Sequence, residues 1–599
     1  MILVIFPQYK YYKKITIDAD LLAIRQPSQL GDDDFDKSKV ILFDKFIPKD
    51  IAEKFNKQAV AESLNHAKIN GQDVTTYKGV SLADINFVEI LLKIFIPAYR
   101  EALSFLSCVG ELRPSVVYLE KEDERLDLFE EIAKQMGVQL KIYDNFGLTD
   151  NDLTNLIKIS YSRVRDVNFH PALKLKIIWR WLVFIYNMWA DIIRFFRGKK
   201  PFVFFTFYKP LNLIKSKLLF SKEYYPVVQR PVKMSIKCLL FSGTKILPFE
   251  DSKIEDKAIK KIIEGYFKIL QENANKAFFG QIDYFKNKIS ISATISKLLK
   301  IIVAPAFYQI AKNIDVLGKF ISNNHIGDCL LNGDSSWENR LIVRMCQKHS
   351  IPNNVVINGI IADDHQIEAK TADTTLYYGE SMRNNYLKDK ANCIPISSPL
   401  YQNAYKKRLK INTKFPPQNI LIGSFTFSPV DINCHYSDSE RFLIEILEVL
   451  KKFAAESKFK FKVSAKLHPA DVKDFYQWFL KDKNFEDVEI IAGGDFQKIV
   501  SKFDLLIINY STAIFETALM GIPVIFYHPN NQMLFEPFDG LGPLPTARST
   551  DELGNMLKKM FENQDYALSF TNIKKLQPFT GPIDGRAGER ILNIINSNL

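Results

Sequence analysis

The chain has 599 residues, too many for one hydrophobic core, and its 47% hydrophobic and 25% charged residues exclude a disordered protein. The formal net charge of +12 indicates an anionic partner, unless it reflects only a lysine-rich, solvated surface. The six cysteines are scattered without a C-x-x-C pair, which excludes a zinc ribbon or a disulfide scaffold and suits a reducing, cytoplasmic compartment.

Strand-like and helix-like patterns alternate from the N-terminus onward. The opening MILVIF reads as a buried strand and not as a signal peptide, because it lacks a basic leading region. Alternation of this kind predicts βαβ units around a parallel sheet, which is the α/β fold class. Strands are predicted at 40–43, 115–120 and 139–144, with helices near 50–67, 84–106 and 123–136.

The region from about 150 to 325 is helix-rich, basic and aromatic, and we interpret it as a helical insertion. Its strand-like runs lie only at 202–207 and 236–242. The strand rhythm resumes after it, so we expect one N-terminal Rossmann-like domain over residues 1–404 that contains the insertion. The resumed strands are predicted at 328–334, 354–360, 374–380 and 392–399.

Residues 173–200 within this region form a helical pattern with a narrow polar stripe. At ~100° per residue, the polar side chains fall in a wedge of about 60° and nearly all others are aromatic or aliphatic. This pattern is typical of a helix in a membrane interface; the alternative is a buried helix with one exposed stripe. No stretch holds about 18 uninterrupted apolar residues, so no transmembrane helix is predicted. The expected membrane contacts are Trp179, Arg180, Trp181, Trp189, Arg194, Arg197, Lys199 and Lys200.

The C-terminal third repeats the strand–helix alternation more clearly. We expect a linker at 405–418, a second Rossmann-like domain at 419–580 and a closing helix at 581–599 that packs back. Ligands of doubly wound domains bind at the carboxyl ends of the strands, so residues there are the candidates for a site. Strands are predicted at 419–425, 460–469, 488–493, 504–509 and 523–528, with helices near 438–456, 471–481, 495–502 and 512–520.

Ser511 and Thr512 follow the strand 504–509 directly and open a helix. Their hydroxyls can cap that helix, and the backbone N–H groups at its start attract anions. Glu516 lies one turn further on, where a carboxylate can accept hydrogen bonds from a ribose; the alternative is a plain cap and a surface glutamate. Gly423 and Ser424, which end the strand 419–425, complete this candidate nucleotide site.

His468 and Pro469 end the strand 460–469. An imidazole there can donate a hydrogen bond to a phosphate, and the proline starts the next helix. A second His-Pro pair, His528 and Pro529, shows that a structural turn is an alternative reading of either pair. Since the carboxyl ends of neighbouring parallel strands meet at one edge, we expect His468 and the Ser-Thr pair to share one crevice.

With these residues, the chain resembles the GT-B transferases that use cytidine-activated donors: bacterial sialyl- and polysialyltransferases, Kdo transferases and CDP-glycerol glycerophosphotransferases. The resemblance covers roughly 325–599 and includes the tail segment 581–587. It implies two Rossmann-like domains facing a cleft, with the acceptor on the N-terminal side. It also implies that the His-Pro and Ser-Thr motifs contact the donor nucleotide and its phosphate.

The segment 333–360 is similar to surface-carbohydrate glycosyltransferases. Those enzymes usually read Gln-His-Gly where this chain has Ile357-Asn358-Gly359, and often Gly-Ser-Pro where it has Ser397-Ser398-Pro399. The missing histidine indicates a different acceptor or reduced activity.

Inverting transfer needs a general base, for which Asp334 and Glu338 are the first candidates. Asp334 ends a predicted strand at the presumed cleft, although an aspartate there can equally be the N-cap of the following helix. Asp363, Asp364 and His365 form a second cluster, which we interpret as a solvated loop.

We therefore expect a metal-independent glycosyltransferase without a cofactor, peripheral on the anionic inner face of the cell membrane. Its donor is a nucleotide sugar, of CMP or CDP type, and its acceptor a lipid-linked or surface glycan. The alternatives are a teichoic-acid-type CDP-polyol phosphotransferase, a sugar-nucleotide 2-epimerase and a degenerate GT-B scaffold. Neither a Walker A loop nor a nucleic-acid-binding pattern is present, so no nucleic-acid partner is expected.

Overall fold

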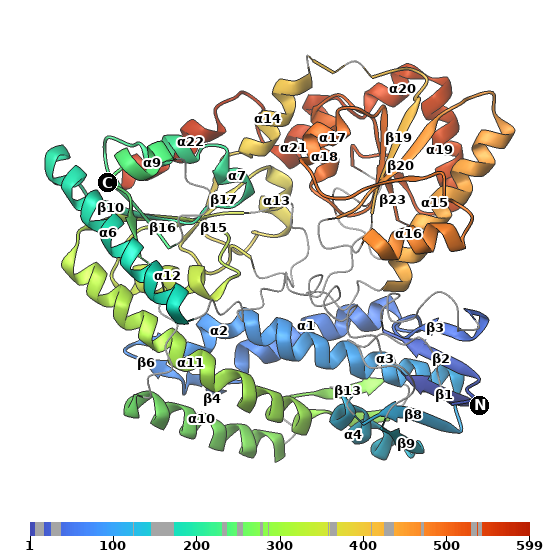
Figure 1. Cartoon of the computed structure of the whole chain (residues 1–599), viewed down its shortest axis with the longest axis horizontal. Coiled ribbons are helices and arrows are strands. Elements are labelled where there is room, and N and C mark those ends of the chain that lie inside the picture. Colours follow the sequence, from blue (N-terminus) through green and yellow to red (C-terminus); the bar gives the residue numbers. More distant parts are fainter. Residues whose placement is uncertain are drawn as a thin grey trace.

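The structure, a computed structural model, confirms the α/β class: it contains three parallel sheets with helices packed on them (Figure 1). It describes the whole chain except residues 6–16, 26–36, 122, 124, 145–172, 230–235, 248, 250–255, 276–278, 285–286, 358, 360–367, 409, 412, 425–435, 469–472, 529–535, 537–538 and 540–541.

The first sheet belongs to residues 1–143 and has the strand order β3-β2-β1-β8-β9. Its central strands are short apolar runs buried on both faces, as parallel strands covered by helices must be. The strands are β1 (Ile2–Ile5), β2 (Leu21–Ile24), β3 (Val40–Leu42), β8 (Val116–Glu120) and β9 (Leu140–Tyr143). The helices are α1 (Lys49–Asn65), α2 (Leu82–Ile90), η3 (Leu91–Phe95), α3 (Ile96–Leu112) and α4 (Leu126–Met136), with small hairpins β4–β7 between Lys68 and Ser81.

The second sheet has seven strands in the order β12-β11-β10-β15-β16-β17-β18. Three of them come from the region that the sequence pattern presents as a helical insertion, and the segment 236–242 is not a strand but the helix α9 (Ile236–Phe241). The residues 1–404 thus hold two parallel sheets where one was expected. The strands are β10 (Phe202–Phe205), β11 (Tyr225–Val228), β12 (Lys245–Ile246), β15 (Ile326–Asn332), β16 (Asn353–Val356), β17 (Thr374–Tyr377) and β18 (Asn392–Pro395).

The reason for the difference is the length of these strands. The run 202–207, predicted as a strand, is β10, but β11 and β12 are only four and two residues long, too short to show a period of their own. An apolar run such as that of α9 cannot be assigned to helix or strand by periodicity alone. The other helices of this part are α6 (Leu173–Arg197), α7 (Lys209–Asn212), α8 (Lys215–Leu219), α10 (Lys257–Asn275), α11 (Ser292–Asn323), α12 (Trp337–Lys348) and α13 (Glu380–Asn385), with the hairpin β13–β14 (Gln281–Tyr284, Asn287–Ser290).

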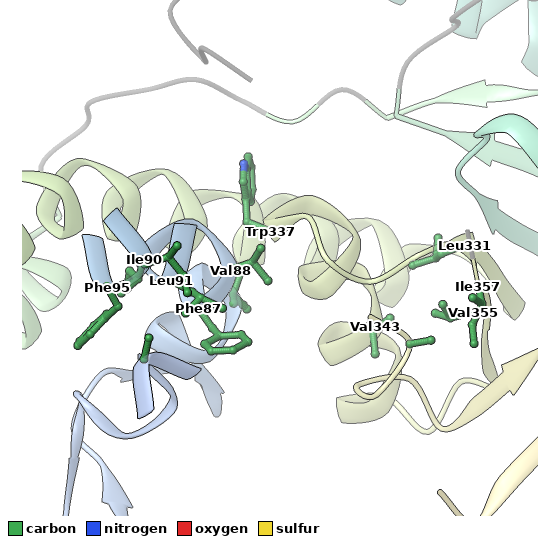
Figure 2. Close-up of a cluster of buried hydrophobic side chains, with 14 of the residues drawn as sticks. Phe87, Val88, Ile90, Leu91, Phe95, Leu331, Trp337, Val343, Val355 and Ile357 are labelled. Atoms are coloured by element: carbon green, nitrogen blue, oxygen red, sulfur yellow. The ribbon is translucent and has the colours of Figure 1, made fainter. Parts of the chain in front are cut away.

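The first and second sheets share one continuous hydrophobic core. Figure 2 shows side chains of α2 and η3, among them Phe87 and Leu91, on one side of that core and Leu331 and Val355 of the second sheet on the other. Among the described helices, α11 has the length and composition of a membrane span, but it packs against α2, α10 and α12.

An ion pair network joins α2 to α12 at the edge of this core. Asp84 accepts hydrogen bonds from Arg340 Nη2 (2.8 Å) and Arg344 Nε (2.6 Å). Burial would raise the pKa of Asp84, but the two guanidinium groups outweigh it and hold that pKa below its usual range.

The third sheet has the strand order β21-β20-β19-β22-β23-β24, which is the Rossmann order 3-2-1-4-5-6. The helix α14 (Pro399–Arg408) precedes the third sheet in the chain and connects it to the second sheet. The C-terminal helix α22 (Ala587–Asn598) returns to pack on β15 of the second sheet. Two Rossmann-like sheets with a returning C-terminal helix form the GT-B arrangement, with the first sheet added beside them (Figure 1). The strands are β19 (Asn419–Gly423), β20 (Lys462–Lys466), β21 (Glu489–Ile491), β22 (Leu505–Ile508), β23 (Val524–Tyr527) and β24 (Thr546–Ala547). The helices are α15 (Tyr436–Glu456), α16 (Lys473–Asp482), α17 (Phe496–Val500), α18 (Ala513–Leu519), α19 (Thr550–Glu562), α20 (Gln564–Ser569) and α21 (Ile573–Thr580).

Candidate functional site

The carboxyl ends of β19 and β20 are joined by hydrogen bonds of the predicted site residues Ser424 and His468. The backbone N–H of Ser424 donates to the carbonyl of Lys466 (3.0 Å), and the backbone N–H of His468 donates to Ser424 Oγ (2.8 Å). The His468 side chain is exposed at this edge. A Cβ on Gly423 would lie 2.6 Å from Ile508 Cδ1, so a larger residue there would require the Ile508 side chain to shift. Pro469 lies outside the described residues.

Ser511 and Thr512 follow β22, the strand on the other side of β19. Ser511 caps the turn, because its Oγ accepts a hydrogen bond from the Ala513 N–H (3.2 Å), whereas the Thr512 side chain makes no capping hydrogen bond. Both side chains are half-buried at the strand's end. The strand order of the sheet reverses between β19 and β22, so these residues and Ser424 flank its topological switch point.

Asn509 sets the shape of the loop that carries this pair. It is buried, its Nδ2 donates to the Tyr527 carbonyl (2.8 Å), and its Oδ1 accepts from the Tyr510 N–H (2.6 Å). The Tyr510 ring packs edge-on against the buried His528 ring, at 5.0 Å between centroids. An asparagine directly after a buried strand is the signal in the sequence that marks such a loop anchor.

Glu516 lies on α18 but faces the junction between the second and third sheets. Its carboxylate accepts a hydrogen bond from Gln497 Nε2 (2.7 Å), and Gln497 Oε1 accepts one from Asn403 of α14 (2.8 Å). Burial raises the pKa of Tyr378 and of Tyr401, and the charge of Glu516 adds to both shifts. Glu516 therefore bridges the two Rossmann-like units, and its role toward a ribose stays a prediction.

The second sheet meets the third at the Ser-Thr loop. A Cβ on Gly359, which follows β16, would lie 3.0 Å from Thr512 Cγ2, so the backbone of one loop contacts the side chain of the other. On the same side of the molecule, Glu536 accepts hydrogen bonds from Ser381 Oγ (3.0 Å) and Asn385 Nδ2 (2.7 Å) of α13. The carboxyl ends of the two sheets thus face each other. Asn358 and the cluster 363–365 lie outside the described residues.

The proposed general base Asp334 is fully buried, which does not fit that role. Its two carboxylate oxygens accept the backbone N–H groups of Ala369 (2.5 Å) and Thr371 (2.8 Å). Nor does Asp334 cap α12, because Ser336 Oγ accepts the hydrogen bond from the Asn339 N–H (3.3 Å). Glu338, in the first turn of α12, is 7% exposed. Asp334 therefore anchors the turn before β17, a role that the sequence pattern cannot distinguish from catalysis.

Asp334→Asn is expected to lower the free energy of unfolding by about 1–3 kcal/mol, because an amide NH₂ would then face a backbone N–H. Activity should fall together with stability. Thermal unfolding and turnover, measured on the same preparation, check this. Full stability with lost activity would instead restore the general-base role.

The residues expected to contact a membrane divide into two groups in the structure. Trp181, Trp189 and Lys199 are exposed, whereas Arg194 is 8% exposed and Arg197 is half-buried. The side chains of Trp179 and Arg180 lie outside the described residues, and Lys200 donates to the Lys222 carbonyl. In the described part of the chain, no group of three or more His, Cys, Asp or Glu side chains is placed to hold a metal ion.

Solved structures align with about two thirds of this chain at low sequence identity and with TM-scores below 0.5. The UDP-GlcNAc 2-epimerase from Neisseria meningitidis bound to UDP-GlcNAc is 15% identical over 67% of this chain and 100% of its own, with a TM-score of 0.41. The UDP-GlcNAc 2-epimerase from Methanocaldococcus jannaschii is 12% identical over 67% of this chain and 100% of its own, with a TM-score of 0.41. A variant of the wall teichoic acid polymerase TagF is 11% identical over 71% of this chain and 96% of its own, with a TM-score of 0.35. No curated protein sequence matches the chain.

A family profile matches the C-terminal part of the chain. The matched family is described as CDP-Glycerol:Poly(glycerophosphate) glycerophosphotransferase, and the match spans residues 435–597, less than half of the chain. This span includes His468, Ser511, Thr512 and Glu516. Among the groups that the two motifs resemble, the profile matches the glycerophosphotransferases, and the resemblance to sialyl- and Kdo-transferases stays a prediction. The matched residues include β20 to β24 of the third sheet but not β19.

Proposed function

We propose that this protein is a transferase of surface-polymer synthesis that takes its donor as a CDP-activated compound. The observation that carries the proposal is the convergence of His468, Ser424, Ser511 and Thr512 at the switch point of a Rossmann-ordered sheet. Ligands of open α/β sheets bind at such a point. The match of residues 435–597 to a CDP-glycerol family supports the cytidine nucleotide.

The exposed His468 and the two hydroxyls supply hydrogen-bond donors for a diphosphate. In this proposal the imidazole donates to a phosphate oxygen as the bond to the leaving CMP breaks. The hydroxyls of Ser511 and Thr512 hold the adjacent phosphate in place, so the charge that develops on the leaving group meets donors already in position.

The transferred group in this proposal is a polyol phosphate, as the matched family's description indicates. Transfer of a sugar from a CMP- or CDP-activated donor is the second candidate, because the His-Pro and Ser-Thr motifs occur with both chemistries. The acceptor is proposed to be a lipid-linked or surface polymer, and the protein to work at the inner face of the cell membrane.

Cytidine nucleotides are expected to bind more tightly than uridine or guanosine nucleotides. A thermal-shift comparison of CMP, CDP, UDP and GDP checks this, since a ligand at 100-fold above its Kd stabilises the folded protein by about 2.7 kcal/mol. The Ser511→Ala/Thr512→Ala variant should lose the shift. Because it also removes the Ser511 cap, which is worth about 1 kcal/mol, its shift is measured against its own unfolding temperature without ligand.

The donors themselves then separate the candidates. A shift with CDP-glycerol and none with CMP-sugars supports polyol phosphate transfer, and the reverse supports glycosyl transfer. A preference for UDP-GlcNAc over every cytidine compound would overturn the proposal in favour of a 2-epimerase, and binding of no nucleotide in favour of a scaffold.

A further inference from the structure

Helix α6 packs on the second sheet with its polar side and not with its apolar side. Asn187 pairs with Ile246 of β12 through two hydrogen bonds of 2.9 Å. Asn187 Nδ2 donates to the Ile246 carbonyl, and the Ile246 backbone N–H donates to Asn187 Oδ1. The Asn187 side chain thereby satisfies one carbonyl and one N–H group of the edge strand β12, as the backbone of a neighbouring strand would.

The two arginines of the last turns of α6 also face inward. Arg194 Nη1 donates to the Gly243 carbonyl (2.9 Å), and its guanidinium lies over the rings of Phe202 and Tyr225. Arg197 donates to the carbonyls of Ser242 (3.0 Å) and Ser221 (2.7 Å). The polar wedge is therefore the docking side of the helix, which leaves the wide apolar face outward.

The outward face is large and continuous. Nine of its apolar side chains are 43–82% exposed, and since a large side chain carries about 200 Å², they present on the order of 1,000 Å². The largest apolar patch of a typical soluble monomer is roughly 300–600 Å². α9 lies beside α6, joined by a hydrogen bond from Trp189 Nε1 to the Leu240 carbonyl (2.9 Å), and adds Leu240 and Phe241 to the face. The nine are Trp181, Leu182, Phe184, Ile185, Met188, Trp189, Ile192, Phe195 and Phe196.

Among the described residues, the charges around this face, which we call the α6–α9 face, are mainly positive. Lys199, Lys222 and Lys237 are exposed near it. The acidic group on α6, Asp191, is paired with Arg194, and Glu223 is the exposed acidic neighbour of Lys222. Lysines around an apolar surface complement anionic headgroups, whereas lysine is depleted at interfaces between proteins.

We infer that the α6–α9 face lies in the headgroup region of an anionic lipid bilayer. In Figure 1, α6 runs from the margin of the molecule toward α12, and its exposed apolar side chains lie on the side away from the second sheet. Phe195 and Phe196, at 82% and 81% exposed, reach furthest into the lipid. This contact would give the proposed membrane location a defined surface, and it does not depend on which group the protein transfers.

Vesicle co-sedimentation tests this inference. The full-length protein is expected to sediment with vesicles of phosphatidylglycerol and phosphatidylcholine and much less with phosphatidylcholine alone. Phe195→Ser/Phe196→Ser should lower binding about tenfold or more, because each phenylalanine buries apolar area in the interface. Lys199→Gln/Lys237→Gln should weaken binding to the anionic vesicles alone, as added salt should for the parent.

The matched control is Ile142→Ser/Tyr143→Ser, a pair on β9 that is 45% and 41% exposed and far from α6 (Figure 1). It should bind vesicles as the parent does. If the parent stays in the supernatant with both kinds of vesicle, the inference is overturned. In that case, ultracentrifugation of the parent and of Phe195→Ser/Phe196→Ser gives the alternative. A parent dimer that the two substitutions dissociate would show that the α6–α9 face is an interface between two copies of the chain.

Discussion

Replacing His468 by alanine is expected to lower transfer from a CDP-activated donor by about 100-fold or more, the usual effect of removing one donor to a developing charge. The loss should come without a loss of stability. The His468 side chain is exposed, and alanine keeps the hydrogen bond from the backbone N–H to Ser424 Oγ. Release of CMP from CDP-glycerol, with a membrane fraction supplying the acceptor, measures the rate.

His349→Ala is the matched control, because His349 is exposed at the end of α12 and away from the switch point. It should turn over at the rate of the parent. If His468→Ala also does so, the imidazole is no part of the site, and the His-Pro pair is a structural turn. A variant that loses both activity and several degrees of melting temperature would show a structural role instead.

Arg194→Gln is expected to destabilise the anchoring of α6 by about 2–3 kcal/mol, since it leaves the buried Gly243 carbonyl without its charged donor. Burial lowers the pKa of Arg194, so this side chain is held in a poorly solvated place that suits a structural contact. Hydrogen exchange of the α6 amides measures the effect locally, because a chain with three sheets need not unfold in one step.

Lys199→Gln serves as the comparison, two residues beyond the end of α6. Its exposed side chain predicts a change within about 0.5 kcal/mol. Equal protection of α6 in the two variants would mean that Arg194 faces outward, as the sequence pattern suggested. In that case the polar wedge and not the apolar face of α6 would be the exposed side.

The local pattern of the sequence was sufficient for five of the six strands of the third sheet and for the residues at their ends, whereas β24, only two residues long, was not predicted. β19, β20, β22 and β23 are apolar runs set between helices of regular period, and parallel strands bring their carboxyl ends to one edge whatever their order. That is why Ser424 and His468 are in contact, although 44 residues separate them in the chain.

The tertiary structure alone decided three other features, each through partners far away in the sequence. The strands β10, β11 and β12 become a sheet only by pairing with one another and with β15. Asp334 is an anchor because the N–H groups of Ala369 and Thr371 meet it. The period of α6 predicts two faces but not which one is covered. The carbonyls of Ile246 and Gly243, about fifty residues downstream, accept hydrogen bonds from the polar side of α6. Its apolar side therefore faces outward.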